Sequence, residues 1–408
     1  MRAPSSPRDR LVFSAFFFAL AHAIALWFVP LSSVLEARNL GWLTPFALAS
    51  TALAAFISPM VSGALADRHF CPVRLIRFLC LSSGLFLFLT FEAIEKGWPS
   101  LAILALLQIQ QLCNAPVWGL ASMTVLASLP NPGRQFGAIR VWGTFGWIAA
   151  CLVVSFILHA DHSPLSGLVS AANWLAVAAL TFWLPAVPPQ AAPAPRRWTA
   201  LLGLESLELL RHQRHRSVFL TAGLLSIPLA AFYPFAALQL RDLGIHSVSA
   251  SMALGQVTEA AAMYALGPLL SRFPLQRLLL CALLACLARY LLFSLHHTAS
   301  VLLGVFLHGI CFTLFFIPAQ IYIEQHIDKA LRFRAQALLT LLISGFGNLA
   351  GYLGCGWLRS LFTSPSGTRW PAYWLTLSLA LLLVGVYFVH SYPADAPQKD
   401  APLPPKLP

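Results

Sequence analysis

The stretch VSASMALGQVTEAAAMYALGPLL, residues 248–270, is long and apolar, yet it carries Gln256 and Glu259. On a helix these two side chains project from nearly the same face. An ionisable side chain in the middle of a membrane span costs about 3 kcal/mol on insertion scales, and it is tolerated where it faces a bundle interior or a water-filled cavity. The stretch therefore predicts a membrane helix with a functional carboxyl inside a bundle of several helices.

The composition of the whole chain agrees with this interpretation. Of the 408 residues, 58% are hydrophobic and 10% are charged, and the mean hydropathy is +0.74. Soluble domains carry about 25% charged residues, so the composition excludes a soluble protein. The recurring apolar stretches are too long for barrel strands. We predict an all-α integral membrane protein with about twelve transmembrane helices, at residues 11–34, 42–65, 73–92, 99–128, 137–159, 164–186, 217–238, 248–270, 275–295, 299–326, 335–360 and 371–391.

The net charge of +12 is a topology signal rather than a sign of nucleic-acid binding. One side of the predicted topology keeps few basic residues, namely Arg38, Lys96, Arg241, Arg359 and Arg369. Nearly all other lysines and arginines, including those near both ends of the chain, fall on the opposite side. Because cytoplasmic loops carry the excess of Lys and Arg, both termini are predicted to be cytoplasmic. The bilayer, and no nucleic acid, is the expected large partner.

The predicted spans fall into two sets of six. Residues 1–186 form the first half, 217–391 the second, and 187–216 a Pro- and Ala-rich cytoplasmic linker with an amphipathic surface helix. The Pro-rich tail 392–408 is expected to be disordered. The halves echo one another, because the loop GALADR (63–68) has a counterpart in GPLLSR (267–272), and Arg134 and Arg332 each precede a span. Substrate would then bind between the halves near mid-membrane.

Neither a metal nor a cofactor is expected. The eight cysteines include no CxxC pair, so no disulfide framework or zinc site is indicated. No GxxxxGK[ST] motif is present, so ATP is not expected to supply energy within this chain. A multi-spanning lipid-linked glycosyltransferase is disfavoured because the outer loops are short and carry few acids. The chain is predicted to be a transporter and not an enzyme.

The motifs resemble those of a known family. GALADR, in the loop after the second span, is similar to the Gly-x-x-x-Asp-Arg element of the major facilitator superfamily. The segments IRVWGTFGW (139–147), GQVTE (255–259) and IEQHID (323–328) resemble the fifth-helix, eighth-helix and tenth-to-eleventh motifs of the bacterial nucleoside:proton symporters. The resemblance implies two six-helix halves, location in the bacterial inner membrane, and a monomer that imports a nucleoside with protons.

The resemblance also implies a set of site residues. Glu259 and Arg140 are the expected proton-coupling pair. The residues expected to contact substrate are Gln256, Thr144, Trp147, Tyr233 and Thr313. Thr313 stands where the family often carries an Asp, and Ser122 stands at an Asn position. Asp67 and Arg68 are expected to act in gating.

Each of these residues also has a structural interpretation. Glu259 and Gln256 could join helices through polar contacts, and Arg140 could extend to the lipid headgroups. Trp147 and Tyr233 could stack on a planar ligand or simply pack. His308 lies in a predicted span, where a lone histidine is a functional candidate.

The predicted function is import of a nucleoside by alternating access, driven by protons. Thr313 and Ser122 lack the acceptors and donors of the residues they replace, which leaves open a proton symporter for sugars or aromatic acids. A transporter-like sensor that binds without transporting is a third possibility.

Overall fold

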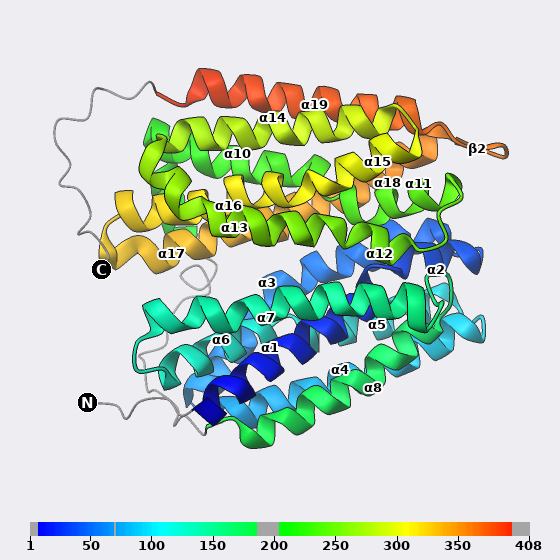
Figure 1. Cartoon of the computed structure of the whole chain (residues 1–408). Coiled ribbons are helices and arrows are strands. Elements are labelled where there is room, and N and C mark those ends of the chain that lie inside the picture. Colours follow the sequence, from blue (N-terminus) through cyan, green and yellow to red (C-terminus); the bar gives the residue numbers. More distant parts are fainter. Residues whose placement is uncertain (1–6, 69–70, 186–203, 394–408) are drawn as a thin grey trace.

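The computed structural model describes residues 7–68, 71–185 and 204–393, and these are helical almost throughout (Figure 1). A short antiparallel hairpin pairs β1 (Thr363–Ser364) with β2 (Gly367–Thr368). The helices form two halves, which lie one above the other in Figure 1. The all-α membrane fold is confirmed.

The first half runs from α1 to η3. Its elements are α1 (Pro7–Phe28), α2 (Leu31–Ala37), η1 (Gly41–Leu43), α3 (Thr44–Arg68), α4 (Pro72–Glu95), α5 (Ser100–Asn114), α6 (Val117–Ser128), α7 (Pro132–Leu152), η2 (Val153–Ile157), α8 (Leu165–Leu180) and η3 (Thr181–Trp183). Two of the membrane spans are each built from two helices, α1 with α2 and α5 with α6. Pro30 and Pro116 lie at the breaks between these helices, because proline lacks the N–H that continues a helix.

The second half runs from η4 to α19. Its helices are η4 (Leu204–Arg211), α10 (Gln213–Leu229), η5 (Phe232–Ala236), α11 (Ala237–Asp242), α12 (Val248–Met252), α13 (Leu254–Arg272), α14 (Leu275–Ser294), α15 (Thr298–Phe306), α16 (His308–His326), α17 (Lys329–Thr340), η6 (Leu341–Gly347), α18 (Asn348–Phe362) and α19 (Trp370–Ser391).

Ten stretches of the described chain are long and apolar enough to cross a membrane. The predicted spans 42–65 and 248–270 are not among them, although both are helical, as α3 and as α12 with α13. Of the first, Gly41–Ile57 is the apolar part within the residues whose side chains the structure describes, and the sequence stays largely apolar to Leu65. In the second, α13 carries Gln256 and Glu259 and ends at Arg272, so the mean hydropathy of this helix is low for a span. The predicted spans 42–65 and 248–270 are thus helices of the bundle, although they are not among the ten apolar stretches.

The described part of the predicted linker, residues 204–216, is largely helical. The predicted amphipathic surface helix is, in its described part, the 3₁₀ helix η4, and α10 begins at Gln213 rather than at 217. The residues from Gln213 to Arg216 have no helix breaker, so the helix starts before the apolar run does. Tyr392, the first residue of the predicted tail, is buried and hydrogen-bonds to the carbonyl of Phe388. The linker 187–203 and the tail 394–408 lie outside the described residues.

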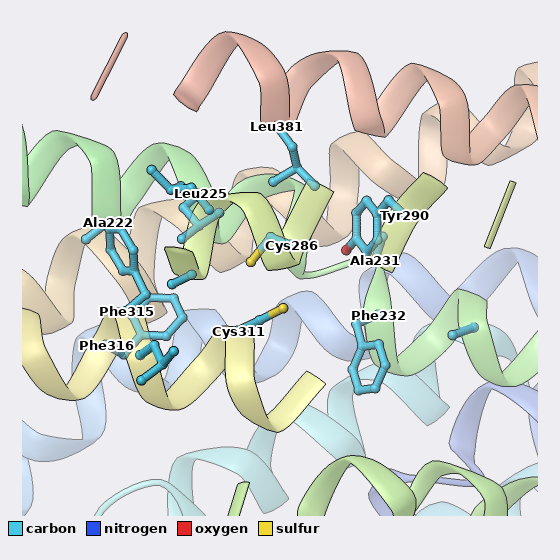
Figure 2. Close-up of a cluster of buried hydrophobic side chains, with 14 of the residues drawn as sticks. Ala222, Leu225, Ala231, Phe232, Cys286, Tyr290, Cys311, Phe315, Phe316 and Leu381 are labelled. Carbon is cyan, nitrogen blue, oxygen red and sulfur yellow. The ribbon is translucent and has the colours of Figure 1, made fainter. Parts of the chain in front are cut away.

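Two apolar clusters form the core, one mostly in each half, and the second-half cluster extends across to Leu26 of α1 and Cys151 of α7. In the first half, α1 lies at the centre and packs against α7 and α8 (Figure 1). Ser170 Oγ and Asn173 Nδ2 donate to the α1 carbonyls of Ala23 and Ala19, at 2.5 and 2.9 Å. In the second half, the buried cluster drawn in Figure 2 joins side chains of α10, η5, α14, α16 and α19.

The two halves meet more closely at one end of the bundle than at the other. We call the end that carries α2, α11 and α12 the closed end, and the end that carries α6 and α17 the open end (Figure 1). At the closed end, α12 packs on α7 and η2, and α11 packs on α2. Toward the open end, α6 and α17 diverge in Figure 1, and α1 begins and α19 ends there.

Candidate functional site

A cavity of about 380 Å³ lies between the halves, in the middle of the bundle. Its volume falls in the range of small-molecule sites. Helices α1, α6 and α7 line it from the first half, and η5, α13 and α16 from the second. The lining residues are Ala21, Ile24, Trp118, Arg140, Gly143, Thr144, Trp147, Tyr233, Gln256, Glu259, His308 and Phe312.

On the first-half side, α7 supplies three predicted site residues. Arg140, Thr144 and Trp147 are spaced at intervals of four and three, which places them on one face of the helix. The Arg140 guanidinium carbon lies 4.1 Å from the ring centroid of Trp118, a cation–π distance. Arg140 therefore turns into the cavity and not toward the headgroups.

On the second-half side, α13 supplies Gln256 and Glu259. Gln256 Nε2 donates to Tyr233 Oη at 3.0 Å, and Glu259 projects from nearly the same face of α13 as Gln256. Glu259 and Arg140 interact electrostatically across the cavity. The carboxyl from one half and the guanidinium from the other thus border the same cavity and attract one another across it.

Glycines allow α13 to approach α16 closely. A Cβ at Gly309 would overlap the backbone of Glu259, and a Cβ at Gly255 would lie 3.1 Å from His308 Cβ. Thr258 Oγ1 closes the same contact by donating to the Phe306 carbonyl at 2.6 Å. The backbone that carries Glu259 is therefore held against α16, and this fixes where the carboxyl enters the cavity.

Aromatic rings complete the wall. The ring centroids of Trp147 and Tyr233 are 6.0 Å apart, and those of Phe28 and Tyr233 are 5.4 Å apart. These rings come from α7, η5 and α1, so both halves contribute. A planar ligand between them could stack against indole or phenol faces.

A second cavity of about 260 Å³ adjoins the first and shares Tyr233, His308 and Phe312 with it. Its remaining polar lining comes from the second half, as Ser226, Gln320, Thr340, Ser344, Asn348 and Tyr352. Together the two cavities form one irregular space with polar groups at several points.

Most of the predicted site residues are brought together, but some are not. Thr313 is fully buried, does not line either cavity, and its Oγ1 has no partner among the described atoms. Ser122 lies outside both cavities and donates to the Trp118 carbonyl at 2.9 Å. The side chains of Asp67 and Arg68 lie outside the described part of the structure.

Sequence reasoning missed two aromatic lining residues, as well as Ala21, Ile24 and Gly143, and it understated the role of His308. Trp118 and Phe312 carry no signal beyond being aromatic residues in spans. His308 is predicted only as a lone intramembrane histidine, whereas it borders both cavities. One signal could have pointed to Trp118. A charged residue inside a span needs a partner, and Trp118 is the ring that Arg140 contacts.

A family model described as "Nucleoside H+ symporter" matches residues 11–395. The chain is 30% identical over 386 residues to the putative nucleoside transporter YegT of Escherichia coli (strain K12), which covers 89% of each chain. It is 25% identical over 345 residues to the nucleoside permease NupG of the same organism, covering 80% of this chain and 81% of that protein.

Solved structures give the same fold. A crystal structure of the nucleoside transporter NupG superposes with a TM-score of 0.84 at 21% identity, covering 95% of this chain and 99% of that one. A bacterial homologue of the human lysosomal transporter Spinster superposes with a TM-score of 0.69 at 14% identity, over 95% and 96% of the two chains. At these identities the likeness shows the fold alone.

Proposed function

The chain belongs to the nucleoside H+ symporter family, and we propose that it imports a nucleoside with a proton by alternating access to the cavity between its halves. The family match favours this over sugars or aromatic acids, and over an enzyme. One observation links this proposal to two particular residues. Arg140 and Glu259 come from different halves and interact across the cavity that both line.

Glu259 is the coupling group in this proposal. When its carboxyl is ionised, attraction to Arg140 holds the two halves together and the pair resists separation. Protonation removes one charge, so Arg140 becomes free to interact with a ligand and the halves can move. Proton binding and the change of access are thus linked through the attraction between Glu259 and Arg140.

The ligand would lie between Trp147 and Tyr233, whose faces can stack on a base. The Gln256 amide offers two donors and an acceptor to the edge of the base, and Thr144, which is nearly buried, offers a hydroxyl. Thr313 takes no part, because it does not border the cavity.

The orientation in the membrane is also a proposal. We assign the closed end to the outer face of the bacterial inner membrane and the open end to the cytoplasm, since the basic residues concentrate near the latter. Both termini are then cytoplasmic, and the linker 187–203 is a cytoplasmic segment. Asp67 and Arg68, at the end of α3, lie where a cytoplasmic gate would form. The unit that transports is a monomer.

Uptake of labelled uridine into cells tests the proposal. Accumulation by the unsubstituted protein should be greater at acidic than at neutral external pH. In Glu259→Gln, accumulation should be lost, while exchange of labelled for unlabelled uridine should persist because exchange needs no net proton movement. Glu92→Gln is the matched control, since Glu92 pairs with Lys96 far from the cavity and should leave accumulation unchanged.

Two outcomes contradict the proposal in different ways. Accumulation by Glu259→Gln that matches the unsubstituted protein removes Glu259 from coupling. No uptake or exchange of any nucleoside by well-expressed protein rejects the nucleoside substrate.

A further inference from the structure

A fully buried arginine lies behind the cavity. Arg289, on α14, is 0% exposed. Its Nη1 lies 2.8 Å from His308 Nδ1, and its guanidinium carbon lies 4.9 Å from the ring centroids of both Phe232 and Tyr290. Figure 2 shows the surrounding cluster, in which Cys286 and Cys311 point toward one another between α14 and α16. Burying a guanidinium in such surroundings is costly, so the contact with His308 needs an explanation.

The chemistry of this contact fixes the state of His308. A guanidinium has five N–H donors and no acceptor. The Nδ1 atom of His308 must therefore accept the hydrogen bond, and it carries no proton. The ring is then neutral and its single proton is on Nε2.

Packing also fixes the orientation of the imidazole ring. It stacks on Phe232 with centroids 4.0 Å apart and planes 8° apart, and it meets the edge of Tyr233 at 5.6 Å. Gly255 packs against its Cβ and its Cδ2, the atom next to Nε2. The Nδ1 edge faces Arg289, so the opposite edge, with Nε2–H, is the one left to border the two cavities that His308 lines.

We propose that Arg289 is a positioning residue that holds His308 as the neutral Nε2–H tautomer, and that this N–H donates to an acceptor atom of the nucleoside base. The acceptor is a carbonyl oxygen or an unprotonated ring nitrogen. This inference rests on the proposed function, since it names a contact within the same site. The contact with Arg289 makes His308 Nε2–H a hydrogen-bond donor of fixed position in the cavity wall beside Gln256 and Tyr233. It also keeps His308 from carrying the coupling proton.

The tautomer can be measured without any substrate. In protein labelled with ¹⁵N-histidine, solid-state NMR distinguishes protonated from unprotonated ring nitrogens, and His308→Gln identifies the signals of His308. We expect an unprotonated Nδ1 and a protonated Nε2 that persist to acidic pH. In Arg289→Met the same ring should show a mixture of forms that changes with pH. A protonated Nδ1 in the unsubstituted protein overturns the inference.

Affinity tests the contact with the ligand. Uridine binding to purified protein is measured for His308→Gln and for the double variant His308→Phe with Arg289→Leu. Gln can accept from Arg289 and still donate, so it should bind within about threefold of the unsubstituted protein. The double variant removes both partners together, which avoids an unpaired buried charge, and should bind about tenfold more weakly.

Uridine analogues that each lack one base carbonyl complete the test. For one of them the unsubstituted protein should lose about tenfold in affinity, while the double variant loses none. Equal uridine affinity in the double variant and the unsubstituted protein overturns this inference and leaves the proposed function intact. If the unsubstituted protein binds no nucleoside, the proposed function itself is rejected.

Discussion

The closed end and the open end of the bundle use their polar side chains differently. At the closed end, polar groups bond from one half to the other, as Asp161 does with the Ser249 N–H at 2.6 Å and Ser155 does with the Ala250 N–H at 3.0 Å. At the open end, comparable groups bond within the second half. His215 Nδ1 lies 2.6 Å from Tyr322 Oη, and Gln213 donates to the Ser391 carbonyl at 3.1 Å.

Among the described residues, the hydrogen bonds that hold the halves together in the present state therefore include those at the closed end. Separating the halves at the closed end requires breaking a few hydrogen bonds, each worth about 1 kcal/mol net. A population shift of one hundredfold needs only about 2.7 kcal/mol, so these contacts are enough to bias the equilibrium between two states. The first half contributes acceptors and the second half contributes backbone donors from α12.

The largest effect on the contact between the halves at the closed end is expected from Asp161→Ala. Asp161 is 3% exposed, and its loss leaves the Ser249 N–H unpaired in a buried place. The cost to the closed end is about 1–3 kcal/mol, which favours separation there by about fivefold or more. Hydrogen exchange of the amides of residues 247–253, followed by mass spectrometry, should accelerate accordingly.

The matched control for that variant is Asp242→Ala. Asp242 also lies at the closed end, but it accepts from Trp370 Nε1 at 2.8 Å within the second half. It should lower thermal stability and leave exchange at residues 247–253 unchanged. The same exchange rate for Asp161→Ala and the unsubstituted protein would show that the bond does not hold the halves together.

The sequence predicted the bundle and much of the cavity, but not this closed end. Span length and hydropathy suffice for the helices, and the cost of Glu259 in a span singled out its helix before any packing was known. Asp161 and Ser155 gave no such signal, because a single acid in a loop and a single serine in a helix are ordinary in a sequence. Their importance arises only when α12 packs on η2.

Thr313 illustrates the opposite failure. It shares α16 with Phe312, which does border the cavity, but the next position along a helix points about 100° away. A motif places residues in sequence, whereas the rotation of α16 against α13 decides which side chains face the cavity. That rotation depends on the glycine contacts at Gly255 and Gly309.

A smaller effect is expected from Glu36→Gln, which weakens an ion pair between the halves. Both Nη atoms of Arg359 lie 3.3 Å from Glu36 Oε2, and the pair is partly exposed. Such pairs contribute about 0–1 kcal/mol. Exchange at residues 247–253 should rise by less than in Asp161→Ala, and high salt should reduce the difference from the unsubstituted protein.

Faster exchange in Glu36→Gln could come from loss of the pair between the halves or from loss of a negative charge at this end. Glu95→Gln distinguishes these two explanations. It removes the Arg38–Glu95 pair, which lies at the same end but within the first half. If both variants accelerate exchange equally, general loss of charge is responsible and not the pair between the halves.

The smallest expected effect comes from His162, which follows Asp161 in the loop between η2 and α8. Burial lowers the pKa of His162 below its usual value of 6.5, and nearby Arg241 and His246 lower this pKa further, whereas Asp161 raises it. The closed end therefore favours neutral His162. Its contribution to closure is present above about pH 6.5 and is lost as the pH falls.

Acid on the side that the closed end faces should thus favour opening of that end, which is the direction that proton-coupled import requires. Exchange at residues 247–253, corrected for the intrinsic effect of pH, should rise on acidification in the unsubstituted protein and much less in His162→Gln. The control is His159→Asn, since His159 is exposed and has a φ of 49°, which Asn tolerates. An equal response to acid in His162→Gln and in the control would mean that other groups at the closed end sense the proton, and that the burial of His162 has no part in opening.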